Sequence, residues 1–357
     1  MINFTVGPVQ SEPFVREIGA EQVPYFRTPE FSEVMLESEQ LILALAHAEE
    51  GARCVFITGS GTASMEAVVM NTLTQEDKAI VIDGGSFGHR FVEMLDLHKI
   101  PHEVIKMQTG QQITEDMLLP FDGKGFTAFL VNVDETSTGI LYDADLISRF
   151  CKKNGIFLIV DAISSFLADE FHMKELGADV MITGSQKALA CPPGISLIIL
   201  SRRALERVEK IPTKCMYLDL KSHLKNMERG QTPFTPAVAT LLQIHARVKN
   251  ITENGGAEGE IRRTKERAEY FRGRISNLPF EIVAENCSNA VTALWVKKEN
   301  ASEICQVLKD EYQIWVCPNG GEMKDKIFRV GHIGDLSFEE YDKLIDAMKE
   351  MQDRGIL

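Results

Sequence analysis

One lysine stands out among the residues that could do covalent chemistry. Lys187 lies in the segment ITGSQKALACPPG (182–194), directly after an apolar run and among small and polar residues. This setting suits a solvated surface lysine poorly, whereas an amine that forms a Schiff base needs rigid placement and a lowered pKa. The alternative interpretation is a structural lysine in a loop at the end of a strand.

Asp161 is the second candidate, because it follows the apolar run IFLIV (156–160). An unpaired carboxylate is costly to bury at the end of a central strand. A protonated pyridine nitrogen is one partner that would keep this carboxyl group ionised. An arginine or a helix N-terminus is the ordinary alternative, and Asp161 considered alone favours that alternative.

A glycine-rich turn is the third candidate. The segment FITGSGTASMEA (56–67) predicts a strand, a turn and a helix, an order that aims backbone N–H groups and the positive end of the helix at one point. The hydroxyl groups of Ser60 and Thr62 add donors, so the turn could bind a phosphate group. It is neither a Walker loop nor GxGxxG, since Ser64 stands at the third glycine position. Alone the signal is weak, because many strand–helix turns contain glycines.

Arg329 is the fourth candidate, in the segment KIFRVGHIGD (326–335), where no acid is adjacent before Asp335. Its guanidinium group suits a carboxylate bidentately, and a structural ion pair is an equal alternative. A phosphate cradle, an acid for a ring nitrogen, a lysine and a late arginine are together the parts of a pyridoxal-phosphate (PLP) site.

The elements that would position these residues alternate between helix and strand from about residue 31 to 200. The spacing of apolar residues predicts helices over 31–50 and 60–73. Near-continuous Val/Ile/Leu runs predict buried strands of a parallel or mixed sheet, whose ligands bind at the carboxyl ends of the strands. These runs are 53–59, 78–84, 126–135, 156–162, 179–184 and 195–200.

The end of the chain has a different pattern. A charged helix is expected over 258–276, shorter strands over 289–296 and 326–332, and a final helix after a capping box formed by Ser337 and Glu340. We therefore predict an α/β protein of two domains. Residues 1–245 would form a large PLP-binding domain with a mixed, mostly parallel sheet, which begins with an extended arm of about 15 residues. Residues 246–357 would form a small α+β domain, with the boundary inside a long helix.

Composition limits the classes of protein to which the chain can belong. The 357 residues, 44% hydrophobic and 25% charged, are typical of a soluble globular protein of about two domains. The net charge of −14 argues against nucleic-acid binding but leaves room for a local anion pocket. No membrane span or secretory signal is predicted. Seven scattered cysteines without a CxxC pair predict reduced thiols in the cytoplasm and no metal site.

Over nearly its whole length the sequence resembles the class-V aminotransferases of PLP fold type I, in the alanine–glyoxylate and serine–glyoxylate branch. The combination of GSQKALACPPG with RVGHIG is the most specific part of this resemblance. The motifs that carry it are FTVGPVQ (4–10), RTPEF (27–31), GSGTASMEA (59–67), DETSTG (134–139), VDAISS (160–165), GSQKALACPPG (184–194), YLDL (217–220), TPFTPAV (232–238) and RVGHIG (329–334).

The resemblance implies a role for each matching position. Lys187 would form the Schiff base with PLP and later move a proton between the substrate Cα and the cofactor. Asp161 would keep the pyridine nitrogen protonated, and Arg329 would bind the substrate carboxylate. Phe87 and Ile163 would face the ring, and Thr136 would lie near its phenolic oxygen. The phosphate contacts would come from Ser60, Gly61, Thr62, Gln186, Thr232 and Thr235.

In this family Thr235, with Thr232 close by, would reach the phosphate of a neighbouring subunit, so the resemblance implies a homodimer. Several positions depart from the branch and leave the amino donor open. Phe26 stands where a histidine is common, Thr232 where some relatives have tyrosine, and Cys191 where alanine is frequent. His332 is either a structural histidine or part of the substrate entrance.

The expected reaction is transfer of an amino group from a small amino acid of the alanine, serine or aspartate type to glyoxylate or pyruvate. A 2-aminoethylphosphonate–pyruvate transaminase is the main alternative, and a lyase, a desulfurase or a non-catalytic PLP-fold protein follows. A desulfurase would need a mobile cysteine and usually a histidine before the lysine. Gln186 precedes Lys187, and Cys317 lies in a segment expected to be a strand, so both disfavour desulfuration.

Overall fold

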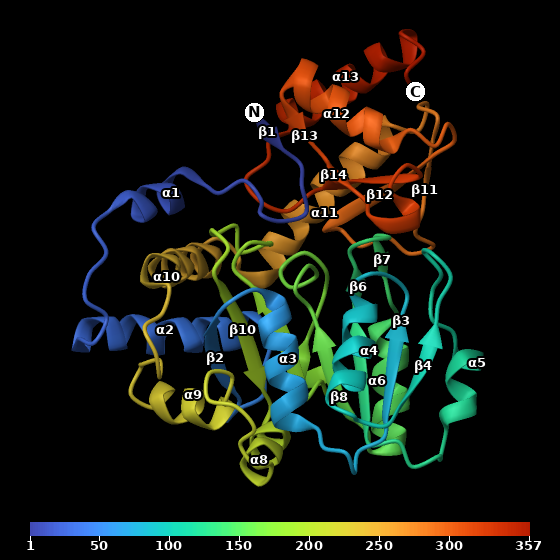
Figure 1. Cartoon of the computed structure of the whole chain (residues 1–357). Coiled ribbons are helices and arrows are strands. Elements are labelled where there is room, and N and C mark those ends of the chain that lie inside the picture. Colours follow the sequence, from blue (N-terminus) through green and yellow to red (C-terminus); the bar gives the residue numbers. More distant parts are fainter.

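The computed structural model describes all residues, 1–357, and places a seven-stranded sheet at the centre of the larger part of the molecule (Figure 1). The strand order is β2-β10-β9-β8-β5-β3-β4. The five strands from β9 to β4 pair in parallel, whereas β10 is antiparallel to both β2 and β9. The predicted mixed, mostly parallel sheet is therefore confirmed. Its strands are β2 (Arg53–Thr58), β3 (Ala79–Asp83), β4 (His102–Lys106), β5 (Ala128–Asn132), β8 (Phe157–Asp161), β9 (Val180–Gly184) and β10 (Ile195–Leu200).

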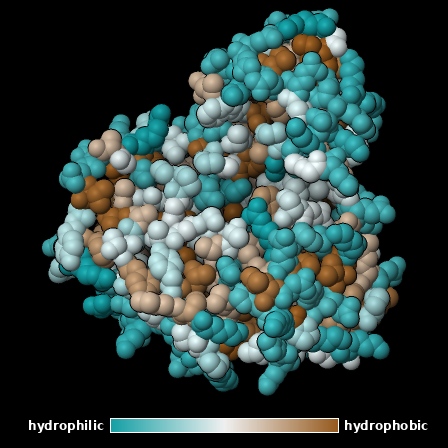
Figure 2. Space-filling view, in the orientation of Figure 1, coloured by the Kyte–Doolittle hydropathy of each residue, from teal (hydrophilic) through white to brown (hydrophobic).

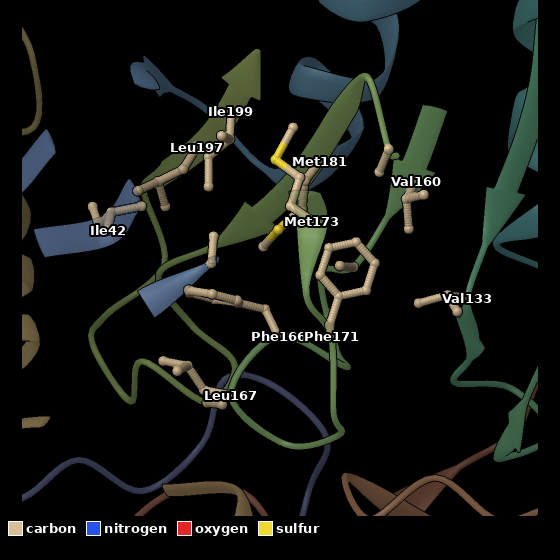
Figure 3. Close-up of a cluster of buried hydrophobic side chains, with 14 of the residues drawn as sticks. Ile42, Val133, Val160, Phe166, Leu167, Phe171, Met173, Met181, Leu197 and Ile199 are labelled. Carbon is tan, nitrogen blue, oxygen red and sulfur yellow. The ribbon is translucent and has the colours of Figure 1, made fainter. Parts of the chain in front are cut away.

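Helices cover both faces of this sheet, which is why its central strands are apolar without interruption. Along β9 and β10, alternate residues enter two separate cores: Met181 and Leu197 belong to one, Ile182 and Ile198 to the other. Figure 3 shows the first core, where Phe166 and Phe171 pack under Met181 and Leu197. The helices of this part are α1 (Pro13–Ala20), α2 (Pro29–Leu45), α3 (Gly61–Thr72), α4 (Gly88–Leu97), α5 (Glu115–Leu118), η1 (Leu119–Phe121), α6 (Ala144–Asn154), α7 (Met173–Leu176), α8 (Arg202–Lys210), α9 (Leu220–Met227) and α10 (Val238–Glu253).

The C-terminal part of the chain forms a four-stranded antiparallel sheet in the order β11-β12-β15-β14, with helices packed against it. The predicted capping box is present, since Glu340 N donates to Ser337 Oγ and Ser337 N donates to Glu340 Oε2. These elements are α11 (Gly256–Arg274), β11 (Phe280–Ile282), β12 (Val291–Val296), α12 (Ala301–Tyr312), β14 (Cys317–Pro318), η2 (Gly321–Met323), β15 (Ile327–Gly331) and α13 (Phe338–Asp353). The predicted domain division at residue 245 lies inside α10 and stays a prediction.

The N-terminal arm crosses between the two parts. Its first strand, β1 (Ile2–Asn3), pairs in parallel with β13 (Ile314–Trp315), and Phe4 is fully buried in the core of the C-terminal part. The arm then runs toward α1 across the larger sheet domain, as Figure 1 shows in dark blue. The arm therefore contacts both parts of the molecule.

Two predicted elements differ in extent from those observed. The helix expected over 31–50 ends at Leu45, because the backbone turns at His47 and Gly51, whose φ angles are 47° and 84°. The strand expected over 126–135 is divided: β5 ends at Asn132, and the short strand β6 (Asp134–Glu135) pairs instead with β7 (Ile140–Leu141). None of the helices combines the length and apolar character that crossing a lipid bilayer demands.

Candidate active site

Lys187, Asp161 and the glycine-rich turn follow strands whose carboxyl ends lie at one edge of the large sheet. β5, β8 and β9 are parallel neighbours, and β2 runs in the same direction because it is antiparallel to β10. Asp161 ends β8, Lys187 follows β9, and the glycine-rich turn follows β2. Ligands of open α/β sheets bind at this edge.

Lys187 is a buried amine without an acid partner. Its side chain is 9% exposed, and Nζ donates its one hydrogen bond to the main-chain oxygen of Val6. Nζ also lies 5.9 Å from the centroid of the Phe87 ring. Burial lowers the pKa of the Lys187 amine, which raises the fraction of neutral, nucleophilic amine near neutral pH.

The N-terminal arm closes over this lysine. A Cβ atom at Gly7 would lie 2.8 Å from Lys187 Cδ and 3.0 Å from Cε, so a side chain at this position would displace the lysine. Gly7 also has a φ of +123°, which residues with a side chain rarely adopt. Val9 N donates to the main-chain oxygen of Gln186 (3.3 Å), which fixes the arm one residue before the lysine.

Asp161 is 1% exposed and held in place by two donors. Ile163 N donates to Oδ1 (2.9 Å) and Asn132 Nδ2 donates to Oδ2 (3.0 Å). Burial raises the pKa of Asp161 to about 6, although these hydrogen bonds offset part of the rise. A cationic partner, such as a protonated ring nitrogen, would stabilise the ionised carboxylate at this position.

The turn between β2 and α3 leaves its donors free. Ser60 is the N-cap residue of α3, but its side chain caps no backbone N–H group. Ala63 N donates to Ser60 O (2.9 Å), whereas Gly61 N, Thr62 N and the Ser60 hydroxyl are free to bind an anion. A Cβ at Gly61 would overlap Ile163 Cδ1, so glycine is needed for the close approach of the turn to the segment after β8.

Arg90 adds a cation beside this turn. Arg90 Nη1 donates to Thr62 Oγ1 (3.0 Å), and its guanidinium carbon lies 4.7 Å from the centroid of the Phe87 ring. Arg90 was not among the residues predicted from the sequence. The sequence feature that could have indicated Arg90 is its position in the first turn of α4, three residues after Phe87.

Glu135 positions the loop that carries Phe87. Its carboxylate is 1% exposed and accepts hydrogen bonds from Phe87 N (3.2 Å), Gly88 N (2.8 Å) and Ser137 N (3.1 Å). The first two donors begin α4, where a negative charge is favourable. Glu135 was likewise missed, because its partner loop lies about fifty residues earlier in the chain.

Arg329 is a buried cation with no carboxylate partner. It lies on β15 and is 8% exposed, with Nη1 donating to Thr136 O (3.1 Å) and Nη2 to Pro318 O (2.7 Å). Nε is buried and has no partner. Main-chain oxygens accept two of its hydrogen bonds, but no carboxylate neutralises its positive charge. A buried guanidinium in this state favours a bound anion, and a carboxylate matches its geometry.

The remaining predicted cofactor contacts are Thr136, Gln186, Thr232 and Thr235, and the side chains of the first three bond or pack with neighbouring protein groups. Thr136 Oγ1 shares a hydrogen bond with Ser164 Oγ (2.7 Å), and the Gln186 side chain packs over Gly184. Thr232 Oγ1 donates to Phe234 O (2.7 Å), while Thr235 is exposed. Neither threonine side chain forms a hydrogen bond with another predicted site residue, so their roles stay predictions.

The three residues whose roles the sequence left open are buried. His332 is fully buried, with Nε2 against Thr292 Oγ1 (2.8 Å) and Nδ1 against Tyr341 OH (3.1 Å). Burial lowers the pKa of His332 well below its usual value, so it is a satisfied structural histidine. Cys191 is 1% exposed, and Phe26 is buried with its edge toward Phe31.

Residues 25–323 match the family described as Aminotransferase class-V. The chain belongs to this family. One relative is the soluble hydrogenase 42 kDa subunit of Anabaena cylindrica. It is 31% identical to this class-V aminotransferase over 87% of this chain and 82% of its own length. The L-aspartate–glyoxylate aminotransferase of Paracoccus denitrificans is 27% identical over 87% and 81%. The solved aspartate aminotransferase of subgroup IV from Thermus thermophilus superposes with a TM-score of 0.89 at 26% identity, over 99% of both chains.

The family and these structures establish a PLP-dependent aminotransferase of fold type I, as the motifs predicted. The residues of this class-V aminotransferase fit the cofactor. A buried lysine without an acid partner, an aspartate whose ionised form needs a cation, and an open helix N-terminus lie at one edge of the sheet. An amine, a carboxylate and an anion site are the three groups that PLP requires.

Proposed function

We propose that this aminotransferase transfers the amino group of a small amino acid, of the alanine, serine or aspartate type, to glyoxylate or pyruvate. The buried, unpaired Arg329 carries the proposal, because amino donor and 2-oxo acceptor share a carboxylate that such a guanidinium binds. The name of the Paracoccus relative, L-aspartate–glyoxylate aminotransferase, supports substrates of this size and charge.

The geometry of the site supports the proposed cofactor contacts. When bound, PLP supplies an electron sink for the pair released at the substrate Cα. Asp161 would hold a proton on the pyridine nitrogen, and Phe87 and Ile163 would lie against the ring. Ser60, Gly61 and Thr62 would bind the phosphate at the α3 N-terminus, with Arg90 behind Thr62.

Lys187 would carry the covalent attachment and then act as the proton carrier. Its lowered pKa favours a neutral amine that accepts a proton from the substrate Cα and returns it at the neighbouring carbon. Arg329 would orient the substrate by its carboxylate, so that the Cα–H bond points at this amine. The arm residues Val6 and Gly7, which lie against Lys187, would exclude water from this proton transfer.

Desulfuration fits the site less well. Cys317 lies on β14, where it is paired directly with Arg329 in the antiparallel sheet. A cysteine held in a strand lacks the mobility that delivery of a thiolate to the substrate requires. The proposal therefore keeps Cys317 as a structural neighbour of Arg329.

We further propose a homodimer located in the cytoplasm. Thr235 is exposed, and so are the apolar side chains of Met216 (77%), Tyr25 (68%) and Tyr217 (45%). Hydrophobic residues gather in groups on the face drawn in Figure 2, which agrees with a surface that a second copy covers. All seven cysteines are free thiols, as a reducing compartment requires. Sedimentation velocity tests the dimer, and a monomer at micromolar concentration would exclude it.

A half-reaction screen tests the proposed substrates. The PLP form is mixed with alanine, serine, aspartate or 2-aminoethylphosphonate, and conversion to the pyridoxamine form is followed by absorbance. We expect rapid conversion with one or more of the carboxylate donors and none in the Lys187→Ala variant. Conversion with 2-aminoethylphosphonate alone would replace this proposal by the phosphonate transaminase, and no conversion with any amine would refute it.

A further inference from the structure

Three potential metal ligands from distant parts of the chain meet on the large domain. His47 follows α2, His172 precedes α7, and Glu258 lies in the first turn of α11. One ligand atom from each lies within 4.8 Å of the other two. None of these residues belongs to the proposed PLP site.

The distances fit a small coordination sphere. His47 Nε2 lies 3.1 Å from Glu258 Oε1, and the two imidazole rings have centroids 4.1 Å apart. Ligand atoms at about 2.0–2.1 Å from a tetrahedral metal ion lie roughly 3.3 Å from one another. The His–Glu pair already has this spacing, and a small rotation of His172 would bring in its ring.

The backbone fixes the two histidines. Met173 N donates to Ala46 O and Lys174 N donates to His47 O, both at 3.1 Å, so the segment after α2 is bonded to the start of α7. His47 has a φ of 47°, an uncommon backbone conformation for a residue with a side chain. This rigid pairing means that binding an ion would order few additional groups.

An acidic cavity borders the cluster. His172 and Glu175 both line a cavity of about 540 Å³, together with Asp143, Asp145 and Glu170. Glu175 Oε2 lies 3.3 Å from His172 Nδ1. The carboxylates concentrate cations at this surface by their negative potential.

We propose that His47, His172 and Glu258 bind a divalent transition-metal ion such as Zn²⁺. Two imidazoles and a carboxylate suit Zn²⁺ and its neighbours, whereas Ca²⁺ and Mg²⁺ prefer oxygen ligands alone. The ion would join the ends of α2, α7 and α11. The expectation of no metal site rested on the cysteines, and these ligands are histidines separated by more than a hundred residues in sequence.

Direct metal binding tests the proposal. Chelator-treated holoenzyme is titrated with Zn²⁺ by calorimetry and with Co²⁺ by visible absorbance. We expect one ion per chain. His47→Asn should weaken Zn²⁺ binding at least about tenfold, and Asn tolerates the positive φ at this position. Glu258→Gln, on an exposed side chain, should weaken it by a similar factor without affecting folding.

His245→Asn is the matched control. His245 Nε2 also pairs with a carboxylate, Glu37 Oε2, at 2.6 Å, but no second imidazole completes a metal-ligand group there. Zn²⁺ affinity should be unchanged in this variant. Equal Zn²⁺ affinity in His47→Asn, Glu258→Gln and the parent, or a Co²⁺–thiolate charge-transfer band, would overturn the proposal.

Discussion

At the scale of single residues, two opposing effects set the pKa of the Asp161 carboxyl group. Burial disfavours its ionised form, whereas the donors Ile163 N and Asn132 Nδ2 favour it. A carboxyl group whose pKa stands near 6 is mostly ionised at pH 7 but loses its charge in mildly acidic solution, and a cationic ring nitrogen would stabilise the ionised form. The site is therefore arranged so that Asp161 and the protonated cofactor stabilise one another.

Asp161→Asn should remove this effect while the site stays folded. The neutral amide cannot stabilise a proton on the pyridine nitrogen, so turnover should fall by at least about 100-fold. Steady-state kinetics with PLP content measured in parallel checks this expectation. Asp179→Asn is the control, because Asp179 is also buried but precedes β9 at the opposite edge of the sheet. A near-normal rate in Asp161→Asn would remove Asp161 from the mechanism.

Arg329→Lys should separate charge from geometry in substrate binding. The variant keeps a cation but loses the fork that binds a carboxylate with two hydrogen bonds. KM for the amino donor should rise about tenfold or more, with a smaller change in kcat and no loss of PLP. Arg247→Lys is the control, since Arg247 is equally buried but is paired with Glu12 and Glu260. Loss of PLP from Arg329→Lys would mean that the arginine serves the cofactor instead.

At the scale of elements, much of the site was predictable because strand ends are visible in the sequence. Lys187 and Asp161 follow apolar runs, and parallel strands bring such ends to one edge. Glu135, Asn132 and Arg90 were not predictable in this way. Their roles depend on contacts between loops that follow different strands. Neither the spacing of apolar residues nor the composition of the sequence indicates those contacts. The division of the predicted strand 126–135 has the same cause, since β6 pairs with β7 rather than with the large sheet.

Glu135→Gln tests the loop that carries Phe87. Glutamine keeps only one acceptor oxygen, so its amide nitrogen must face either Phe87 N and Gly88 N or Ser137 N and cannot accept from them. The favourable charge at the α4 N-terminus is also lost. The free energy of unfolding should fall by about 2 kcal/mol, and PLP should dissociate faster. Denaturant unfolding and PLP release by fluorescence measure the two effects. Glu115→Gln, at the first turn of α5, should change neither.

At the scale of the whole molecule, one buried carboxyl group couples stability to pH. Asp134 is 1% exposed, and neither of its carboxyl oxygens has a partner, since Ser164 Oγ donates to the main-chain oxygen instead. Burial and the nearby negative Asp169 raise its pKa to about 8. Between the unfolded value near 4 and this folded value, the folded state binds the extra proton, so stability falls as pH rises.

Asp134→Asn should therefore gain stability relative to the parent as pH rises. The variants should differ little at pH 4, and by pH 8 the asparagine variant should be more stable by on the order of 2–4 kcal/mol. Urea unfolding of both holoenzymes across this range gives the comparison. Asp122→Asn should show the opposite trend, because hydrogen bonds from Lys153 and Asn154 lower the pKa of Asp122. A constant difference between parent and Asp134→Asn would contradict the linkage.

The N-terminal arm couples the two parts of the molecule through Phe4. Phe4 N donates to Trp315 O (2.8 Å), Gly331 N donates to Phe4 O (2.7 Å), and the ring packs 4.9 Å from that of Tyr341. Two residues later, Val6 O accepts from Lys187 Nζ. The packing of the small C-terminal core thus sets the position of the chain that lies over the catalytic amine.

Phe4→Ala should accordingly affect stability and turnover together. Removing a fully buried ring should cost about 3–5 kcal/mol. The loosened arm should also admit water to Lys187, so that kcat falls even where the variant is still folded. Phe4→Leu should recover most of both, because it refills the cavity. Leu119→Ala, which shortens a 57% exposed side chain in η1, far from the arm in sequence, should change neither. Normal kcat in a destabilised Phe4→Ala would show that the arm only supports the fold and does not shield the catalytic amine.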